Sequence, residues 1–148
     1  MLRTITTRTG KLTASLALSA LLLGTASAGE PAGENWHRDW PTAWRDSQAQ
    51  SRPILLYITM DNCYCCDQMS QETYADAGVQ SELQNQFVVA SISVEEHRRL
   101  VEHLKIRSFP TTIIMGADRQ ILDCMSGYVG PQKMRTRLEA ATAKLAQR

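Results

Sequence analysis

A buried apolar segment of this chain runs directly into a cluster of cysteines. Residues 53–59, PILLYIT, form a continuous apolar run of the length expected for a strand buried on both faces. The next segment, MDNCYCCDQM, contains Cys63, Cys65 and Cys66, three of the four cysteines in the chain. From Cys63 onward the hydrophobic spacing turns helical. The sequence therefore places its thiols where a buried strand passes into a helix.

This junction suits Cys63 and Cys66 to thiol–disulfide exchange. Unpaired backbone N–H groups and the positive end of the helix dipole favour a thiolate over a thiol at Cys63. One turn further on, Cys66 can attack a mixed disulfide formed at Cys63, so we predict a nucleophile followed by a resolving thiol. A Cys-x-x-Cys pair also binds zinc, but zinc sites usually need a second pair, and only the distant Cys124 remains.

The first 28 residues have the features of an export signal. They combine a basic start, a Leu- and Ala-rich run over residues 12–23, and small residues at Ala26 and Ala28. We therefore predict a signal peptide that is cleaved after Ala28, and a periplasmic or secreted protein. A retained anchor is the alternative. However, the run is interrupted by polar residues and falls short of the ~20 apolar residues of a spanning helix, so we expect no stable membrane insertion after cleavage.

Length and charge limit the remaining possibilities. A chain of 148 residues with 43% hydrophobic residues can bury one ordinary core, so we expect one domain. Loss of the three basic residues of the signal changes the formal charge from +1 to −2. A nearly neutral domain offers no electrostatic argument for nucleic acid, and none is expected as a partner. Export also favours disulfides, which persist outside the cytosol.

Hydrophobic periodicity predicts a mixed α/β fold. Residues 29–35, GEPAGEN, suggest a flexible leader, and residues 36–148 form the domain. We predict the order helix, strand, helix, strand, helix, strand, strand, helix, which suits a βαβ first half, a hairpin second half and helices on both faces of the sheet. The predicted strands cover residues 53–59, 87–94, 109–116 and 120–130, and the helices cover residues 41–50, 63–74, 79–87 (after a break at Gly78), 95–106 and 131–148.

Several residues outside the cysteine cluster are assigned structural roles. Trp36, Trp40 and Trp44 recur every four residues, and we interpret this aromatic stripe as core packing. Cys124, in the last predicted strand, is expected to be a buried small hydrophobe. The three histidines have no ligand spacing with the cysteines and are expected at the surface or at helix ends; they are His37, His97 and His103.

With these motifs in view, the chain resembles the thioredoxin-like superfamily over residues 40–145. The resemblance rests on NCYCCDQM at the active-site turn, SFPTT in the loop that holds a cis-proline, and SGYVG before the last helix. The segment from residue 40 to Cys66 is most similar to the exported or periplasmic thiol–disulfide oxidoreductase branch. The resemblance implies a thioredoxin-like fold with a central mixed sheet flanked by helices.

The resemblance also implies how substrates bind. Pro110 is expected to be cis and to face the cysteines, and the backbone of Phe109 can pair with an extended substrate as an added strand. Asn62 and Tyr64, beside Cys63, are the other candidate substrate-binding residues. The implied partners are proteins with thiols or disulfides and an unidentified redox partner, and we expect a monomer without a cofactor or a bound metal.

The chain departs from thioredoxins at several site positions. Asn62 replaces the Trp before the first cysteine, and Tyr57 and Ser91 stand where thioredoxins bury an Asp and its Lys partner. Losing both charges together leaves no unpaired buried charge, but it removes the group that helps deprotonate the resolving thiol. Cys65 replaces a proline, and Asp67 stands where Lys is common; both are candidates for redox tuning.

We therefore predict an exported thiol–disulfide oxidoreductase that acts through Cys63 and Cys66. Cys65 could be inert, tune the redox potential or form a shuffled link to Cys63. One alternative function is a Cu(I)-binding module in which the three thiolates are helped by Met60 or Met69. Another is a non-catalytic adaptor whose cysteines only lock the start of the helix.

Overall fold

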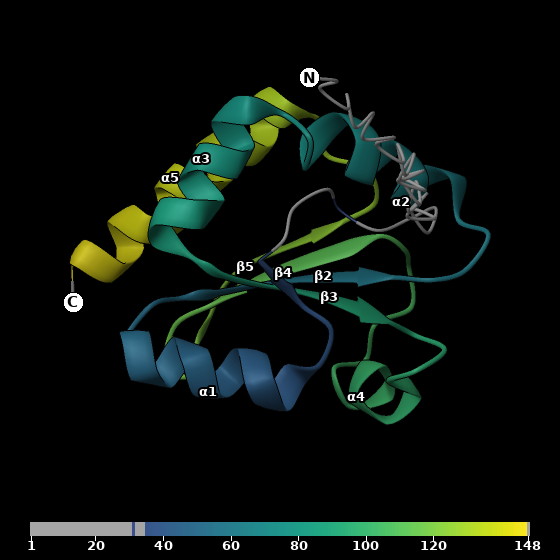
Figure 1. The fold of residues 1–148 in the computed structure, drawn as a ribbon, viewed down its shortest axis with the longest axis horizontal. Helices are drawn as coiled ribbons and strands as arrows, with labels where there is room; N and C mark the ends of the chain where they lie inside the picture. The colour runs from purple at the N-terminus through teal and green to yellow at the C-terminus, as the bar shows by residue number, and fades with distance from the viewer. Residues whose placement is uncertain (1–30, 32–34, 148) are drawn as a thin grey trace, which may run out of the picture.

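The computed structural model describes Pro31 and residues 35–147 (Figure 1). The predicted signal peptide, residues 1–28, and most of the predicted leader, residues 29–35, lie outside the described residues. The elements in chain order are β1 (Trp36–His37), α1 (Trp40–Gln50), β2 (Ile54–Thr59), α2 (Tyr64–Gln68), the π-helical turn η1 (Met69–Thr73), α3 (Ala77–Gln86), β3 (Val88–Ser93), α4 (Arg98–His103), β4 (Thr111–Met115), β5 (Ile121–Ser126) and α5 (Pro131–Ala146).

The five strands form one mixed sheet in the order β1-β3-β2-β4-β5. β1 and β2 both pair with β3 in parallel, whereas β4 is antiparallel to β2 and β5 is antiparallel to β4. This arrangement confirms the predicted βαβ first half and hairpin second half. β1 was not predicted, because a strand of two residues is too short to show a periodicity.

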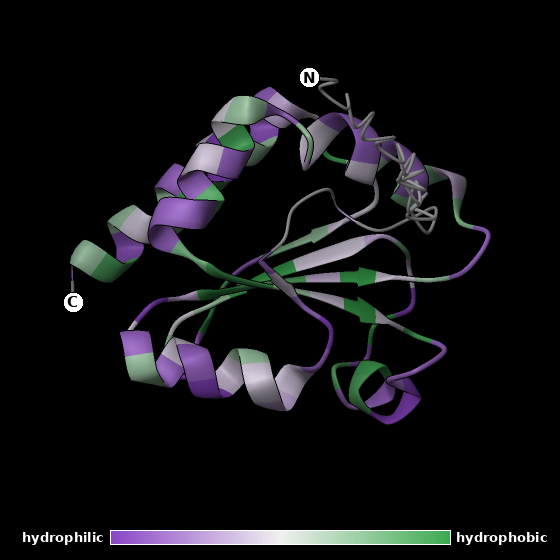
Figure 2. Ribbon diagram, in the orientation of Figure 1, coloured by the Kyte–Doolittle hydropathy of each residue, from purple (hydrophilic) through white to green (hydrophobic). Residues whose placement is uncertain are grey.

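Helices cover both faces of the sheet. Figure 1 shows α2, α3 and α5 on one face and α1 and α4 on the other. β2 lies at the centre of the sheet, and all six of its residues are buried, as its unbroken apolar run predicts. Alternate residues of β2 contribute to two separate core clusters: Leu55 and Tyr57 face α2, α3 and α5, and Ile54, Leu56 and Ile58 face α1 and α4. Figure 2 shows the apolar residues concentrated in these central strands.

Two helix boundaries differ from the prediction. Gly78 does not break the chain but lies inside α3, which begins after Asp76, whose carboxylate accepts a hydrogen bond from the Val79 N–H at 3.0 Å. The two acidic residues expected at the start of α4 precede it, and the cap residue is His97. Both errors arise because a helix boundary depends on the backbone angles of the cap residues, and hydrophobic spacing carries no information on those angles.

The aromatic stripe is divided between the two faces. Trp36 lies in β1 and packs edge-on against Tyr57 and Tyr74 on one face. Trp40 and Trp44 stack on each other in α1, on the opposite face. All three contact the core as predicted, but the four-residue spacing is helical only between Trp40 and Trp44.

The prediction that Cys124 is buried is wrong, because its side chain is exposed. β5 is an edge strand, and among the described residues the core cluster beneath α1 and α4 takes its strand residues from β2, β3 and β4 and none from β5. Cys124 faces that uncovered side, whereas its neighbours Leu122 and Met125 are buried on the other side.

No helix in the described part of the chain is long and apolar enough to cross a membrane.

Candidate active site

The cysteine turn leaves the end of β2 and enters α2. Asn62 takes a left-handed conformation with φ of 54°, a region that Asn tolerates better than most residues. Cys63 is the N-cap of α2, and its sulfur accepts a hydrogen bond from the Cys66 N–H at 3.2 Å. The sequence places a cysteine where a helix start usually carries Ser, Thr, Asp or Asn. The same N–H also donates to the Cys63 carbonyl at 2.9 Å, so the sulfur is its second acceptor.

Cys63 and Cys66 form a disulfide, with their Cα atoms 5.2 Å apart. The two cysteines differ in exposure: Cys63 is half-buried, whereas Cys66 is fully buried in the core cluster beneath α2. A substrate sulfur can therefore approach Cys63 from solvent but not Cys66. This asymmetry fits the order of roles that the sequence predicts, with Cys63 reacting with substrates and Cys66 resolving.

The loop before β4 lies at the same end of the sheet as the cysteines. The Phe109–Pro110 peptide bond is cis. Thr111 pairs with Ile58 near the end of β2, so Pro110 lies across from the start of the cysteine turn. The Pro110 carbonyl accepts a hydrogen bond from the Gly127 N–H at 2.7 Å, which ties this loop to the end of β5. Pro110 is buried and Phe109 is half-buried.

Exposed apolar side chains lie around the cysteine turn and the Pro110 loop. Tyr64, beside Cys63, is 78% exposed, and Met60 is 38% exposed. Tyr128, which follows Gly127, is 37% exposed, and its hydroxyl donates to Glu72 at 2.6 Å. This bond to a carboxylate raises the pKa of Tyr128. From the sequence, Met60 is a candidate metal ligand only, and Tyr128 has no predicted role although it lies within the SGYVG motif.

A buried hydroxyl lies beneath the disulfide. Tyr57 has no exposed surface, and its hydroxyl donates to the Cys66 carbonyl at 2.8 Å. Burial is the main reason why the pKa of Tyr57 is raised. Ser91 lies directly opposite Tyr57 on β3 and is also buried, so the two positions that replace a charged pair are cross-strand neighbours. Sequence reasoning missed the bond to Cys66, because a contact across nine residues leaves no local pattern.

The remaining candidate residues divide between the surface and the core. Cys65 is a free, exposed thiol, and Asp67 is half-buried. Met69 is fully buried in the core cluster and is not available as a ligand at the surface, which corrects its proposed part in Cu(I) binding. Within the described residues, no three His, Cys, Asp or Glu side chains gather as a possible metal site.

The histidines lie apart from this chemistry. His97 caps α4, and the exposed His103 is its last residue, as expected for helix ends. His37 differs from the other two in lying in β1, where its Nε2 is 3.2 Å from a carboxylate oxygen of Asp46.

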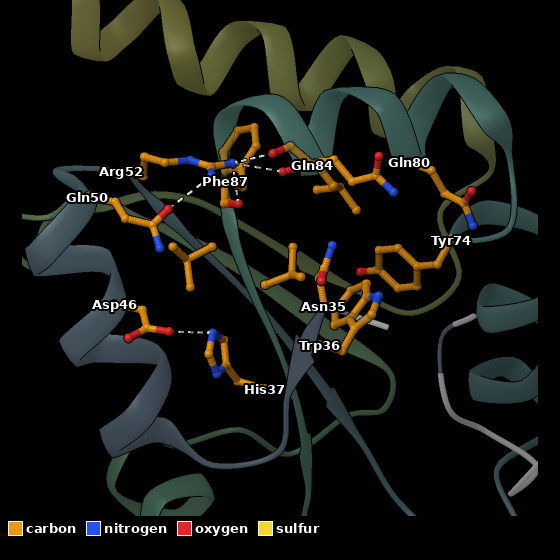
Figure 3. Close-up of a pocket in the computed structure, with 13 residues that line it drawn as sticks. Asn35, Trp36, His37, Asp46, Gln50, Arg52, Tyr74, Gln80, Gln84 and Phe87 are labelled. Atoms are coloured by element: carbon orange, nitrogen blue, oxygen red, sulfur yellow. Dashed lines mark hydrogen bonds and ion pairs between the residues drawn. The ribbon is translucent and has the colours of Figure 1, made fainter. Parts of the chain in front are cut away.

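A pocket of about 440 Å³ lies at the other end of the sheet (Figure 3). It is bordered by Val88, the first residue of β3, whereas the cysteines follow the last residue of the parallel strand β2. Arg52 donates from one guanidinium nitrogen to three carbonyls at the end of α3, those of Leu83, Gln84 and Phe87. The lining residues include no cysteine, so the pocket is separate from the disulfide.

Comparison with known proteins identifies the family. The family described as thioredoxin-like domain matches residues 40–142, more than half of the chain. The chain belongs to the thioredoxin-like domain family. A search of curated proteins by sequence finds no significant match.

Solved structures agree with this assignment of the thioredoxin-like domain. A thioredoxin from Thermus thermophilus superposes with a TM-score of 0.68 at 25% identity, over 75% of this chain and 90% of that one. The DsbH oxidoreductase gives a TM-score of 0.66 at 17% identity, over 84% and 95% of the two chains. The reduced C-terminal domain of Neisseria meningitidis DsbD gives 0.59 at 18% identity, over 67% and 90%. The latter two similarities concern the fold alone.

Proposed function

We propose that this protein is an exported thiol–disulfide oxidoreductase that exchanges disulfides with other proteins through Cys63 and Cys66. One observation carries the proposal: a disulfide at the start of α2 joins one partly exposed cysteine to one that is fully buried. A disulfide that served only to lock the helix start would not need this difference in access. Closing a loop of so few residues also contributes little to stability.

The exchange needs no cofactor, because the cysteines themselves carry the electrons. In the reducing direction, the Cys63 thiolate attacks a substrate disulfide, forms a mixed disulfide and releases one substrate thiolate. Cys66 then loses its proton, attacks the Cys63 sulfur and releases the second thiolate, which takes up a proton. Two electrons pass from the cysteine pair to the substrate. The oxidising direction runs through the same mixed disulfide in reverse order.

We propose that substrates bind to the surface formed by the cysteine turn and the neighbouring Pro110 loop. The exposed Tyr64 and Asn62 flank Cys63, and Phe109 precedes the cis peptide bond. An extended peptide can pair with the backbone of Phe109 while its sulfur reaches Cys63. We propose that the protein acts as a monomer and that a separate redox partner restores its starting state.

The export of the protein rests on the N-terminal segment. Its basic start, apolar run and small residues before Gly29 fit a cleaved secretory signal. We expect the mature protein recovered from the exported fraction to begin at Gly29. N-terminal sequencing checks this, and a chain that retains residues 1–28 contradicts it.

Reduction of insulin by dithiothreitol tests the activity. We expect the protein to accelerate insulin precipitation, at a lower rate than an ordinary thioredoxin, because no buried acid assists Cys66. Cys63→Ser should abolish the acceleration, whereas Cys124→Ser, a control on the exposed face of β5, should retain it. Full turnover by the Cys63→Ser protein would end the proposal. No turnover by the unaltered protein in either direction would favour the adaptor function.

A further inference from the structure

The hydroxyl of Tyr57, a residue of β2, reaches the backbone of Cys66, the proposed resolving cysteine. It donates to the Cys66 carbonyl at 2.8 Å, and neither side chain has exposed surface. The Met69 N–H also donates to the Cys66 carbonyl, but it donates to the Cys65 carbonyl at the same time. A shared donor holds each acceptor less firmly than a dedicated one. The Tyr57 hydroxyl therefore adds an attachment of the Cys66 backbone to the sheet.

The ring of Tyr57 is held on two sides. Tyr74 packs edge-on against it with ring centroids 4.8 Å apart, and Trp36 does so at 6.4 Å. The ring stands on β2, all six of whose residues are buried. Since the ring cannot shift without disturbing these contacts, its hydroxyl is a fixed point beneath α2.

The hydroxyl remains a donor during exchange. Burial raises the pKa of Tyr57, so the group keeps its proton at neutral pH. A neutral phenol does not accept a proton from Cys66 as a carboxylate would. Whatever Tyr57 contributes to exchange must therefore come from where it holds the backbone.

We propose that Tyr57 is a positioning residue for the Cys66 step, holding the Cys66 backbone so that its sulfur stays aligned with that of Cys63. This inference rests on the proposed exchange activity. In that step the Cys66 thiol loses its proton, its sulfur bonds to Cys63, and the substrate thiolate leaves and takes up a proton. In the reverse direction the substrate thiolate attacks Cys63 and the Cys66 sulfur leaves. Tyr57 holds the same atoms in both directions.

A two-phase reaction with dithiobis(nitrobenzoic acid) isolates this step. The first coloured nitrothiobenzoate ion is released when Cys63 attacks, and the second when Cys66 displaces it from the mixed disulfide. The parent and each variant also carry Cys65→Ser and Cys124→Ser, so that only the pair reacts. Tyr57→Phe keeps the ring and removes the hydroxyl. We expect it to leave the first phase within about twofold and to slow the second about five- to tenfold, the effect of one lost hydrogen bond.

Tyr74→Phe is the matched control. It removes a buried hydroxyl from the same aromatic group, but that hydroxyl pairs with Thr112 at 2.8 Å and not with Cys66. Both of its phases should stay within about twofold of the parent, since the bond to Cys66 is intact. An unchanged second phase in Tyr57→Phe, or an equal slowing in Tyr74→Phe, would overturn the positioning role. A parent that never releases the second ion would instead refute the proposed function.

A measurement on the unsubstituted protein guards against misfolding of the variant. Deuteration of the Tyr57 hydroxyl should shift the carbonyl carbon resonance of Cys66 in both the oxidised and the reduced protein. Loss of this isotope shift on reduction would mean that the bond is absent when Cys66 attacks, and the positioning role would be refuted.

Discussion

Cys65 lies beside the reactive pair, exposed and unbonded, in the first turn of α2. Cys63 is the cap, so residue 65 is the second position of the helix. N–H groups in the first helical turn have no partner within the helix, so a proline costs little there. A proline at this position would therefore cost no hydrogen bond within the helix, and the cysteine found there leaves the reduced turn with more conformational freedom.

Cys65→Pro should make the pair more reducing. Stiffening the turn lowers the entropy lost when the disulfide closes, which stabilises the oxidised form by about 0.4–1 kcal/mol. This corresponds to a shift of about 10–20 mV downward, from a starting potential that we expect to be somewhat above thioredoxin's ~−270 mV. Equilibration with glutathione buffers measures the shift.

Cys65→Ser is the control for the thiol itself. It removes the sulfur and keeps a flexible turn, so its potential should match that of the unaltered protein. If Cys65→Ser shifts the potential as much as Cys65→Pro, the thiol and not the backbone tunes the pair. If neither variant shifts it, Cys65 is not a tuning residue.

Single residues also show where sequence reasoning stops. The cysteine pair and its place at the start of α2 could be predicted, because a motif and its flanking spacing are local. Tyr57 could be recognised as the replacement for an acid, but its bond to Cys66 depends on the sheet and α2 coming together. The exposure of Cys124 likewise depends on which face of β5 the helices leave uncovered.

At the level of elements, the segment after β3 supports the turn that precedes Cys63. Glu95 accepts a hydrogen bond from the Asp61 N–H at 3.1 Å and another from the Ser93 hydroxyl at 2.7 Å. Burial acts to raise the pKa of Glu95, but its bonds to Ser93 and Asp61 together hold it below the usual value. The carboxylate thus connects the end of one strand to the turn that follows its neighbour.

Glu95→Gln should loosen this turn in a pH-dependent way. A carboxyl with a lowered pKa contributes its bonds fully above its unfolded pKa and loses them as the pH falls through the folded one. At neutral pH we expect the Asp61 amide to exchange with solvent about threefold faster in the variant, and the difference should vanish in acid. Glu96→Gln, an exposed neighbour, is the control. A difference that persists below the pKa of Glu95 would rule out this carboxylate as the cause.

The longer elements could be predicted because each repeats a pattern over several residues. The side chains of Met134, Leu138, Ala141 and Leu145, spaced three or four residues apart, form the face of α5 that packs against the core. The π-helical turn η1 could not be predicted, because Cys66, Met69, Ser70 and Thr73 are spaced as in an ordinary α-helix. Which hydrogen bonds a helix adopts within such a pattern depends on its tertiary contacts.

Considered as a whole, the molecule separates its two principal surface features. The disulfide, the cis peptide bond and the exposed Tyr64 lie together at one end of the sheet, beyond the last residue of β2. The pocket beside Arg52 lies at the opposite end. The order of elements was enough to predict the fold class, and the motifs NCYCCDQM, SFPTT and SGYVG carried the resemblance to the thioredoxin-like family. The partners of the reactive end leave no comparable pattern, because they depend on surfaces of other proteins.

Trapping those partners tests the central claim most directly. With Cys66→Ser, the mixed disulfide at Cys63 cannot be resolved, so the variant expressed with its signal should accumulate covalent adducts with other proteins that reductant releases. Mass spectrometry should map the adducts to Cys63, and Cys65→Ser added to Cys66→Ser should leave them in place. Adducts that map to Cys65 or Cys124, or a folded Cys66→Ser protein with no adducts, would contradict an oxidoreductase that works through the Cys63–Cys66 pair.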